Sequence, residues 1–99
     1  MTKYKLVISP GVYDDIRNAV EWYDKQQKGL GSKFYAQLTN EFRLLMKNPH
    51  FQLRYSNIRC LPVKKFPFLI HLHVNDKEGI VYIEAIIHTS QNSENWPKK

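Results

Sequence analysis

The fold is decided by residues 68–88, which read FLIHLHVNDKEGIVYIEAIIH. Phe68, Ile70, Leu72 and Val74 alternate with Leu69, His71, His73 and Asn75, and this two-residue period is typical of a β-strand. Residues 80–88 are apolar on both faces, which favours a central strand covered on both sides. The turn at 75–79 ends in a glycine that tolerates a positive φ angle. The stretch therefore predicts an antiparallel hairpin.

A further strand is predicted just before this hairpin. Ile58, Cys60 and Pro62 alternate with Arg59, Leu61 and Val63. Because proline has no N–H to donate to a ladder, Pro62 indicates an edge position or a bulge.

The first half of the chain reads as one strand and two helices. Residues 4–8 alternate and are rich in strand formers. Ser9-Pro10 predicts a helix start in which serine supplies the capping oxygen, and apolar residues keep helical spacing to about Gln27. Gly29-Leu30-Gly31 should end this helix in a left-handed cap. A second helix then runs up to Asn48-Pro49, where the residue before proline avoids the helical region.

These elements predict an α+β fold in a single domain, residues 1–99, with the order β-α-α-β-β-β. Two helices joined by so short a linker should form an antiparallel hairpin. We expect this hairpin to pack on one face of a small, mostly antiparallel sheet.

The positive charge of the chain comes from one segment. Residues 42–75 hold six basic residues and no acidic one, namely Arg43, Lys47, Arg54, Arg59, Lys64 and Lys65. Nine Lys and Arg lie outside this segment against nine Asp and Glu, so it accounts for the whole formal charge of +6. Such a block is a footprint for a polyanion or an acidic protein partner, or it is a solvated surface that aids solubility.

Composition argues against several classes of protein. The single cysteine, Cys60, forms no internal disulfide and fits a reducing compartment. The N-terminus has no apolar signal region, and no apolar run is long enough to span a membrane, so we expect a cytoplasmic protein. His71 and His73 share one strand face, but two ligands fall short of a zinc site. We expect no metal and no cofactor.

The candidate site residues lie in the basic block and near the C-terminus. His88 ends a buried strand and has a near-neutral pKa suited to proton transfer, although it could instead hydrogen-bond a loop. If Arg59 and Lys65 share a sheet face, they form a cationic row for phosphates. Edge-strand protection explains the lysines equally well.

Aromatic residues near the basic block suggest partner contacts. Phe66 lies within the block, and Trp96 lies in a polar tail, where it would be a lid on the sheet or an anchor for a partner.

Five stretches of the chain form a recognisable pattern in order: Trp22-Tyr23, Gly29-Leu30-Gly31 with Phe34, Asn48-Pro49, residues 59–68 (RCLPVKKFPF) and residues 85–96 (AIIHTSQNSENW). Together they resemble the RelE/ParE family of bacterial toxins, and its ParE-like branch in particular. The resemblance covers nearly the whole chain.

The resemblance implies the toxin of a type II toxin–antitoxin module, with the fold predicted above and a cognate antitoxin that wraps an acidic segment around it. ParE-like members inhibit DNA gyrase, whereas RelE-like members cleave mRNA in the ribosomal A site. For cleavage, the resemblance implies that Arg54, Arg59, Lys64 and Lys65 bind phosphates, and that His88 and Lys65 are catalytic. Phe66 and Trp96 remain our candidate partner contacts.

One departure favours the ParE-like action. Family members usually carry an arginine after the terminal histidine, and this chain has Gln91 and Ser93 at about those places, which is also consistent with a weakened or inactive toxin. A cation that neutralises developing phosphate charge is thus missing. We therefore keep three hypotheses in this order: a ParE-like toxin, a ribosome-dependent endoribonuclease, and a non-toxic module of the same fold that binds nucleic acid or protein.

Overall fold

The computed structural model describes residues 3–50 and 57–89, and the backbone alone of residues 53–55. It contains two long helices, α1 (Pro10–Gln26) and α2 (Leu30–Lys47). The strands are β1 (Lys5–Ile8), β2 (Leu53–Tyr55), β3 (Ile58–Pro62), β4 (Phe68–Asn75) and β5 (Ile80–His88). The strands form one sheet in the order β1-β5-β4-β3-β2.

The predicted hairpin forms the centre of the sheet. β4 and β5 pair antiparallel from Phe68↔His88 to Asn75↔Ile80. The register shifts beside His71, so that Glu84 is an extra residue in β5, which is the pattern of a β-bulge. β1 joins β5 in parallel, whereas β3 and β2 extend the sheet antiparallel on the side of β4. The sheet is therefore mostly antiparallel, as predicted.

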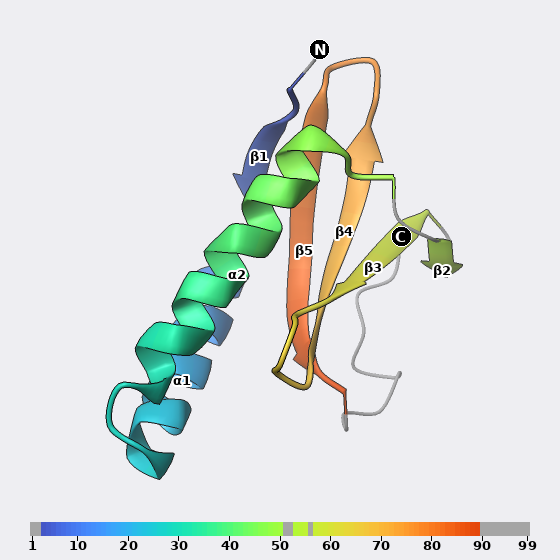
Figure 1. Cartoon of the computed structure of the whole chain (residues 1–99). Coiled ribbons are helices and arrows are strands. Elements are labelled where there is room, and N and C mark those ends of the chain that lie inside the picture. The colour runs from blue at the N-terminus through green and yellow to red at the C-terminus, as the bar shows by residue number, and fades with distance from the viewer. Residues whose placement is uncertain (1–2, 51–52, 56, 90–99) are drawn as a thin grey trace.

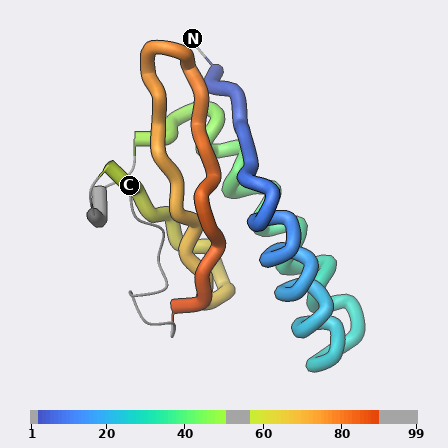
Figure 2. The backbone as a smooth tube through the Cα atoms, turned by 180° about the vertical axis from the view of Figure 1, so that it is seen from behind, coloured from blue at the N-terminus to red at the C-terminus, as the bar shows by residue number. Residues whose placement is uncertain are grey.

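Both helices lie on the same face of the sheet and run beside each other as a hairpin (Figure 1). Seen from behind, both helices lie at the β1 edge of the strands, and α1 lies in front of α2 (Figure 2). The turn between β4 and β5 and the turn between β3 and β4 lie at opposite ends of the sheet (Figure 1).

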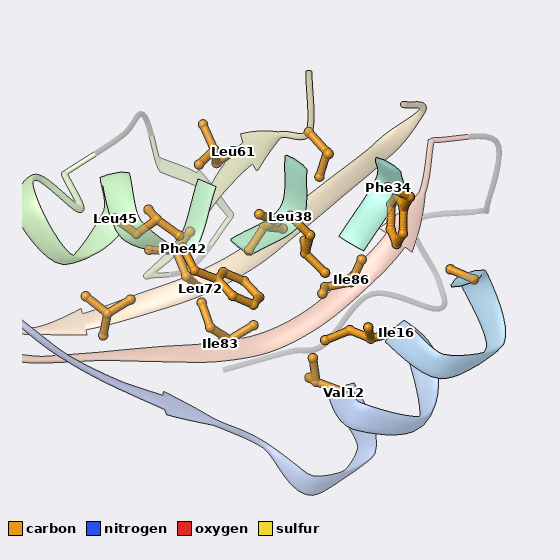
Figure 3. Close-up of a cluster of buried hydrophobic side chains, with 14 of the residues drawn as sticks. Val12, Ile16, Phe34, Leu38, Phe42, Leu45, Leu61, Leu72, Ile83 and Ile86 are labelled. Carbon is orange, nitrogen blue, oxygen red and sulfur yellow. The ribbon is translucent and has the colours of Figure 1, made fainter. Parts of the chain in front are cut away.

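The core fills the space between the helical hairpin and the sheet. Side chains of α1, α2, β3, β4 and β5 meet there (Figure 3), among them Ile16, Phe34, Leu38, Leu72 and Ile83. Phe34, Leu38, Leu72 and Ile83 are fully buried. The apolar positions that repeat along each element are thus the ones that the fold removes from water, which is the main favourable term in folding.

Gly29 and Gly31, at the junction of the two helices, have different structural roles. Gly29 has a φ angle of 88°, a left-handed conformation that glycine adopts at little cost, and it reverses the chain. Gly31 already belongs to α2, and a Cβ atom there would lie 2.4 Å from the Val20 carbonyl oxygen. The Gly31 N–H donates to Asp24 Oδ1 at 2.8 Å. Gly31 therefore allows α2 to lie directly against α1.

The predicted element order and fold class are confirmed, with three local corrections. α1 does not end in a left-handed glycine cap, because its C-cap is Gln27 with an extended backbone, and the left-handed Gly29 is the N-cap of α2. Ser9 stands at the start of α1, but its side chain makes no capping bond, and its carbonyl oxygen accepts instead from the Val12 N–H at 2.9 Å. The short strand β2 was not predicted. It has only three residues, and its pairing with β3 shifts register, so it leaves no clear period in the sequence.

Candidate functional site

The lysines of the basic block lie in a turn and not on a strand. β3 ends at Pro62, and Lys64 and Lys65 belong to the turn at 63–67 that leads into β4. Leu61 and Val63, which the predicted row would have placed between the cations, are buried in the core. The expected row of Arg59 and Lys65 along one strand face therefore does not form.

A buried carboxylate holds this turn against α2. Glu41 is only 1% exposed, and its Oε2 accepts from the Lys64 backbone N–H at 3.0 Å and from Gln37 Nε2 at 3.0 Å. The next residue, Lys65, has a φ angle of 72°, which is unusual for a residue other than glycine. The turn is thus fixed in position while both lysine side chains are exposed.

This turn and α2 enclose a groove of about 740 Å³, which we call the basic groove. Its lining residues are Leu30, Lys33, Ala36, Gln37, Asn40, Arg43, Lys65 and Phe66. Three of the eight are cations and none is acidic. Sequence reasoning missed Lys33 because it lies far from the basic block in the chain. Its helical spacing to Gln37, Asn40 and Arg43 is the signal that could have placed it beside them.

His88 lies on the face of the sheet that packs against the helices. It pairs with Phe68 across the hairpin, and the two rings pack edge to face with their centroids 5.2 Å apart. Together with Ala19, Trp22 and Tyr23, they line a small apolar pocket of about 230 Å³ against α1. Trp22 is 57% exposed although it belongs to this aromatic group.

The end of β5 also contacts the turn that carries the lysines. The Thr89 N–H donates to the Pro67 carbonyl oxygen at 2.8 Å. Phe66 is half-buried and packs edge to face on Tyr23 and on Phe34, with ring centroids 5.2 Å apart in each case. His88, Phe66 and the two turn lysines therefore lie at the same end of the sheet.

A polar cluster lies toward the opposite end of the sheet, and the charge of Arg59 acts on it. In this cluster, Asp76 Oδ1 accepts from the Tyr4 hydroxyl at 2.7 Å and contacts His50 Nε2 at 2.8 Å. These two hydrogen bonds, and then the charges of His50 and Arg59, hold the pKa of Asp76 below its ordinary value. The Tyr4–Asp76 bond raises the pKa of the Tyr4 phenol. Arg59 therefore acts on a different part of the surface from Lys64 and Lys65.

The two strand histidines both have structural partners. His71 is fully buried, with its Nδ1 3.6 Å from Cys60 Sγ. His73 Nδ1 lies 2.7 Å from Glu84 Oε2, and the His73 ring stacks on the Tyr82 ring with their centroids 4.8 Å apart. Within the part of the chain that the structure describes, no three potential ligands come together to hold a metal ion.

A second groove, mainly apolar, runs between the two helices beside β1, and we call it the helical groove. It has a volume of about 520 Å³, and Ile8, Tyr13, Val20 and Tyr35 are among its lining residues. Tyr13 and Tyr35 are 58% and 52% exposed. β1 is an edge strand of the sheet, and its Val7 is 42% exposed. Apolar surface of this kind beside an open strand edge is typical of a protein-binding site.

Some predicted residues cannot be placed. Trp96, Gln91 and Ser93 lie outside the described residues, and so does the side chain of Arg54. Among the helices that the structure describes, none has the length and apolar character needed to cross a bilayer.

The fold as a whole is that of known bacterial toxins. A chain of a chromosomal ParDE TA system from P. aeruginosa superposes with a TM-score of 0.77 at 13% identity, covering 89% of this chain and 98% of that one. The isolated E. coli RelE toxin gives a TM-score of 0.67 at 15% identity, covering 92% and 89%. A double arginine-to-alanine mutant of E. coli RelE in the free state gives 0.68 at 15% identity, covering 90% and 86%.

This chain therefore has the RelE/ParE toxin fold, as its sequence pattern predicted. No protein-family model and no curated protein sequence matches it.

Proposed function

We propose that this chain is the toxin of a type II toxin–antitoxin module. In this proposal it inhibits growth by a ParE-like action on DNA gyrase, and a cognate antitoxin neutralises it. The observation that carries the proposal is the superposition on a chain of the ParDE TA system, which extends over 98% of that chain. The superposition also covers 89% of this chain, so the likeness involves nearly the whole fold and not a shared motif.

The surface of the molecule supports a protein partner of this kind. The helical groove exposes Tyr13 and Tyr35 to solvent, and the neighbouring β1 edge is available for strand addition. An antitoxin segment that fills the groove and pairs with β1 would cover this apolar surface.

The choice of a ParE-like action rests on the departure at Gln91 and Ser93 and on the sheet face opposite the helices, since the resemblance implies that RelE-like members use basic residues on a sheet face for cleavage. Its residues on β3, β4 and β5 include Cys60, Leu69, His73, Tyr82 and Ile87, and no described residue of these strands on that face is Lys or Arg. RNA cleavage requires cations that stabilise charge developing on phosphate. This face is poorly equipped for that chemistry.

A ribosome-dependent endoribonuclease is the second candidate, favoured by one observation. His88 and Lys65 lie at the same end of the sheet, where the turn at 63–67 contacts the end of β5. A histidine that transfers a proton and a lysine that holds phosphate would be placed there.

Expression of the chain alone tests the toxin proposal, which predicts slowed growth that the product of the adjacent reading frame relieves. Tyr35→Asp should prevent this relief, because it places a charge in the helical groove. Leu44→Asp is the matched control, since Leu44 is an exposed apolar residue of α2 outside the groove. Unimpaired growth at high levels of folded protein would contradict the proposal.

The target is tested separately. The purified chain should inhibit supercoiling by DNA gyrase, whereas primer extension on cellular transcripts should show no cuts in translated codons. Cuts that disappear in both His88→Ala and Lys65→Ala, with folding intact, would instead establish the endoribonuclease.

A further inference from the structure

We propose that the basic groove between α2 and the turn at 63–67 binds a free nucleoside triphosphate. Its volume of about 740 Å³ is typical of a site for a small molecule. The inference rests on the groove itself and holds whether or not the chain is a toxin. The ligand is not the mRNA chain of the cleavage hypothesis, and two of the three cations that would hold it, Lys33 and Arg43, are not among the phosphate-binding residues of that hypothesis.

The cations of the groove are available for a phosphate chain. Lys33, Arg43 and Lys65 line it, and no ion pair in the described part of the chain engages any of the three. The nearby acidic residue, Glu41, is buried and already accepts two hydrogen bonds. The groove therefore presents positive charge that its own walls leave unpaired. A triphosphate carries the complementary charge, and hydrogen bonds from Lys and Arg to phosphate are short and strong.

The placement of Lys65 indicates that the groove is preorganised. A positive φ angle is unfavourable for a residue with a side chain, and glycine or asparagine would be the usual choice at such a position. Here a lysine takes it, at φ 72°, and lines the groove. The Lys64–Glu41 bond and the packing of Phe66 hold the turn on both sides of it. A cation on a backbone that is held in place in advance loses less entropy when it binds.

Two side-chain amides of α2 lie between the cations of that helix and offer a donor and an acceptor. Gln37 Nε2 donates to Glu41 Oε2 at 3.0 Å, and Asn40 Oδ1 accepts from Arg43 Nη1 at 3.3 Å. These bonds orient both amides. They leave Gln37 Oε1 to accept and Asn40 Nδ2 to donate, and no hydrogen bond among the described residues engages either atom. The two residues are three positions apart, so they are neighbours on one helix face. Because nucleobase edges present donors beside acceptors, the pair can bind a base as well as its phosphates.

The floor of the groove suits one base and not a strand of stacked bases. Leu30, Ala36 and Phe66 provide apolar surface for the flat face of a single base. A single-stranded nucleic acid gains much of its affinity from successive bases that stack on open aromatic rings. The Phe66 ring is instead half-buried and packed on Tyr23 and Phe34, and no other aromatic residue is among the described lining residues. A free nucleotide therefore fits the groove better than a nucleic acid strand.

Titration calorimetry of the whole chain with ATP and with GTP, in buffer that contains EDTA, tests the proposal. Inorganic triphosphate, adenosine and an oligo(A) RNA are the comparison probes. We expect at least one of the two nucleotides to bind about tenfold more tightly than inorganic triphosphate, because the base adds contacts to those of the phosphates. Adenosine should bind more weakly than either nucleotide, since it lacks the phosphates. Nucleotide binding should weaken as salt is raised.

Two charge-matched double variants locate the site. Lys33→Gln with Arg43→Gln should weaken nucleotide binding about tenfold. Lys5→Gln with Lys77→Gln removes the same charge from exposed positions outside the groove and should weaken it less than about twofold. All four residues are exposed, so thermal unfolding should show both variants folded.

A third variant separates the base from the phosphates. Asn40→Ala removes the amide that donates to the base and should weaken nucleotide binding about fivefold. It should leave the binding of inorganic triphosphate unchanged, which serves as the control ligand for this variant. In NMR titrations of the wild type, shifts induced by the nucleotide should centre on α2 and on Lys65 and Phe66.

Four outcomes would overturn the proposal. Equal losses in the two double variants would show attraction by net charge alone. Binding of both nucleotides no tighter than that of inorganic triphosphate, or no binding of either, would show that the groove does not recognise a nucleoside. Unchanged nucleotide binding in Asn40→Ala would show that the amides do not contact the base. Tighter binding of oligo(A), lost in the Lys33/Arg43 variant, would assign the groove to an RNA strand.

Discussion

One residue in the turn at 63–67, Lys65, adopts a backbone conformation that is unfavourable for a residue with a side chain. Lys65 adopts a left-handed backbone that glycine would accept more readily, whereas its neighbour Lys64 has no positive φ angle. Both are exposed lysines in the same turn. Glycine substitutions at the two positions therefore separate the effect of left-handed backbone strain on stability from the effect of losing a lysine side chain.

Lys65→Gly should raise the free energy of unfolding by about 0.5 kcal/mol, because relief of the left-handed strain exceeds the entropy that glycine adds to the unfolded chain. Lys64→Gly should lower it by about 0.5–1 kcal/mol, since there only the entropy term operates. Urea denaturation of both variants measures the difference. Equal destabilisation would show that the positive φ angle of Lys65 carries no cost.

Glu41 shows how one buried polar side chain holds a turn in place. Glu41→Ala should lower the free energy of unfolding by about 2 kcal/mol, because the Lys64 N–H and the Gln37 amide lose their acceptor. Glu41→Gln keeps an oxygen for the Lys64 N–H and should cost less than half as much. Glu21→Ala, at an exposed position of α1, should change stability by no more than about 0.5 kcal/mol. A small effect of Glu41→Ala would mean that the turn does not depend on this carboxylate.

At the scale of elements, the helical hairpin depends on the close approach of α1 and α2. Gly31 allows this approach, since any Cβ there would lie within 2.4 Å of the Val20 carbonyl oxygen and 2.8 Å of the Asp24 carboxyl group. Both obstacles belong to α1, and the first is backbone that cannot rotate away. Gly31 therefore permits the close approach of the two helices at this end of the hairpin.

Gly31→Ala should lower the free energy of unfolding by about 2–3 kcal/mol, because the helices must move apart and the core between them loosens. Gly11→Ala is the matched control. Gly11 also lies in a helix, but a Cβ there meets nothing within 4 Å, so this change should stabilise the chain slightly. Thermal unfolding of the two variants checks the contrast, and similar melting temperatures would contradict the close contact.

At the scale of the whole molecule, the cluster at Asp76 connects parts of the chain that are far apart in sequence. Its hydrogen bonds join Tyr4 before β1, His50 after α2 and the turn between β4 and β5. The Tyr4 N–H also donates to the Met46 carbonyl oxygen at 2.8 Å, which ties the N-terminal segment to the end of α2. This end of the molecule is thus closed by polar contacts, whereas the opposite end is packed by aromatic rings.

The cluster makes stability depend on pH in a stated direction. Since the folded pKa of Asp76 lies below its ordinary value of 3.8, the ionised carboxylate stabilises the fold above that pH. The contribution is lost as pH falls through the lower, folded pKa. Asp76→Asn should therefore lower the urea midpoint at pH 5 to 7, and the gap from the wild type should close below about pH 4. A gap that stays constant down to pH 2 would contradict this linkage.

Local patterns in the sequence account for most of the architecture. The two-residue period of 68–75, the apolar run of 80–88 and the helical spacing before Asn48-Pro49 each predict an element that the structure contains. These patterns are informative because each element must bury one face, and its period is fixed by backbone geometry. The basic block likewise predicted positive charge around Lys64 and Lys65.

The arrangement of the side chains around the candidate sites could not be read in this way. Lys33 and Lys65 are 32 positions apart, yet they line one groove, because Glu41 anchors the turn at 63–67 to α2. Arg59 and Lys65 are close in sequence but lie toward different ends of the sheet, because β3 ends at Pro62 and Lys65 belongs to the turn that follows. Residue patterns thus established the elements and their order. Which cations share a surface follows from long-range packing, because it depends on contacts that no local period encodes.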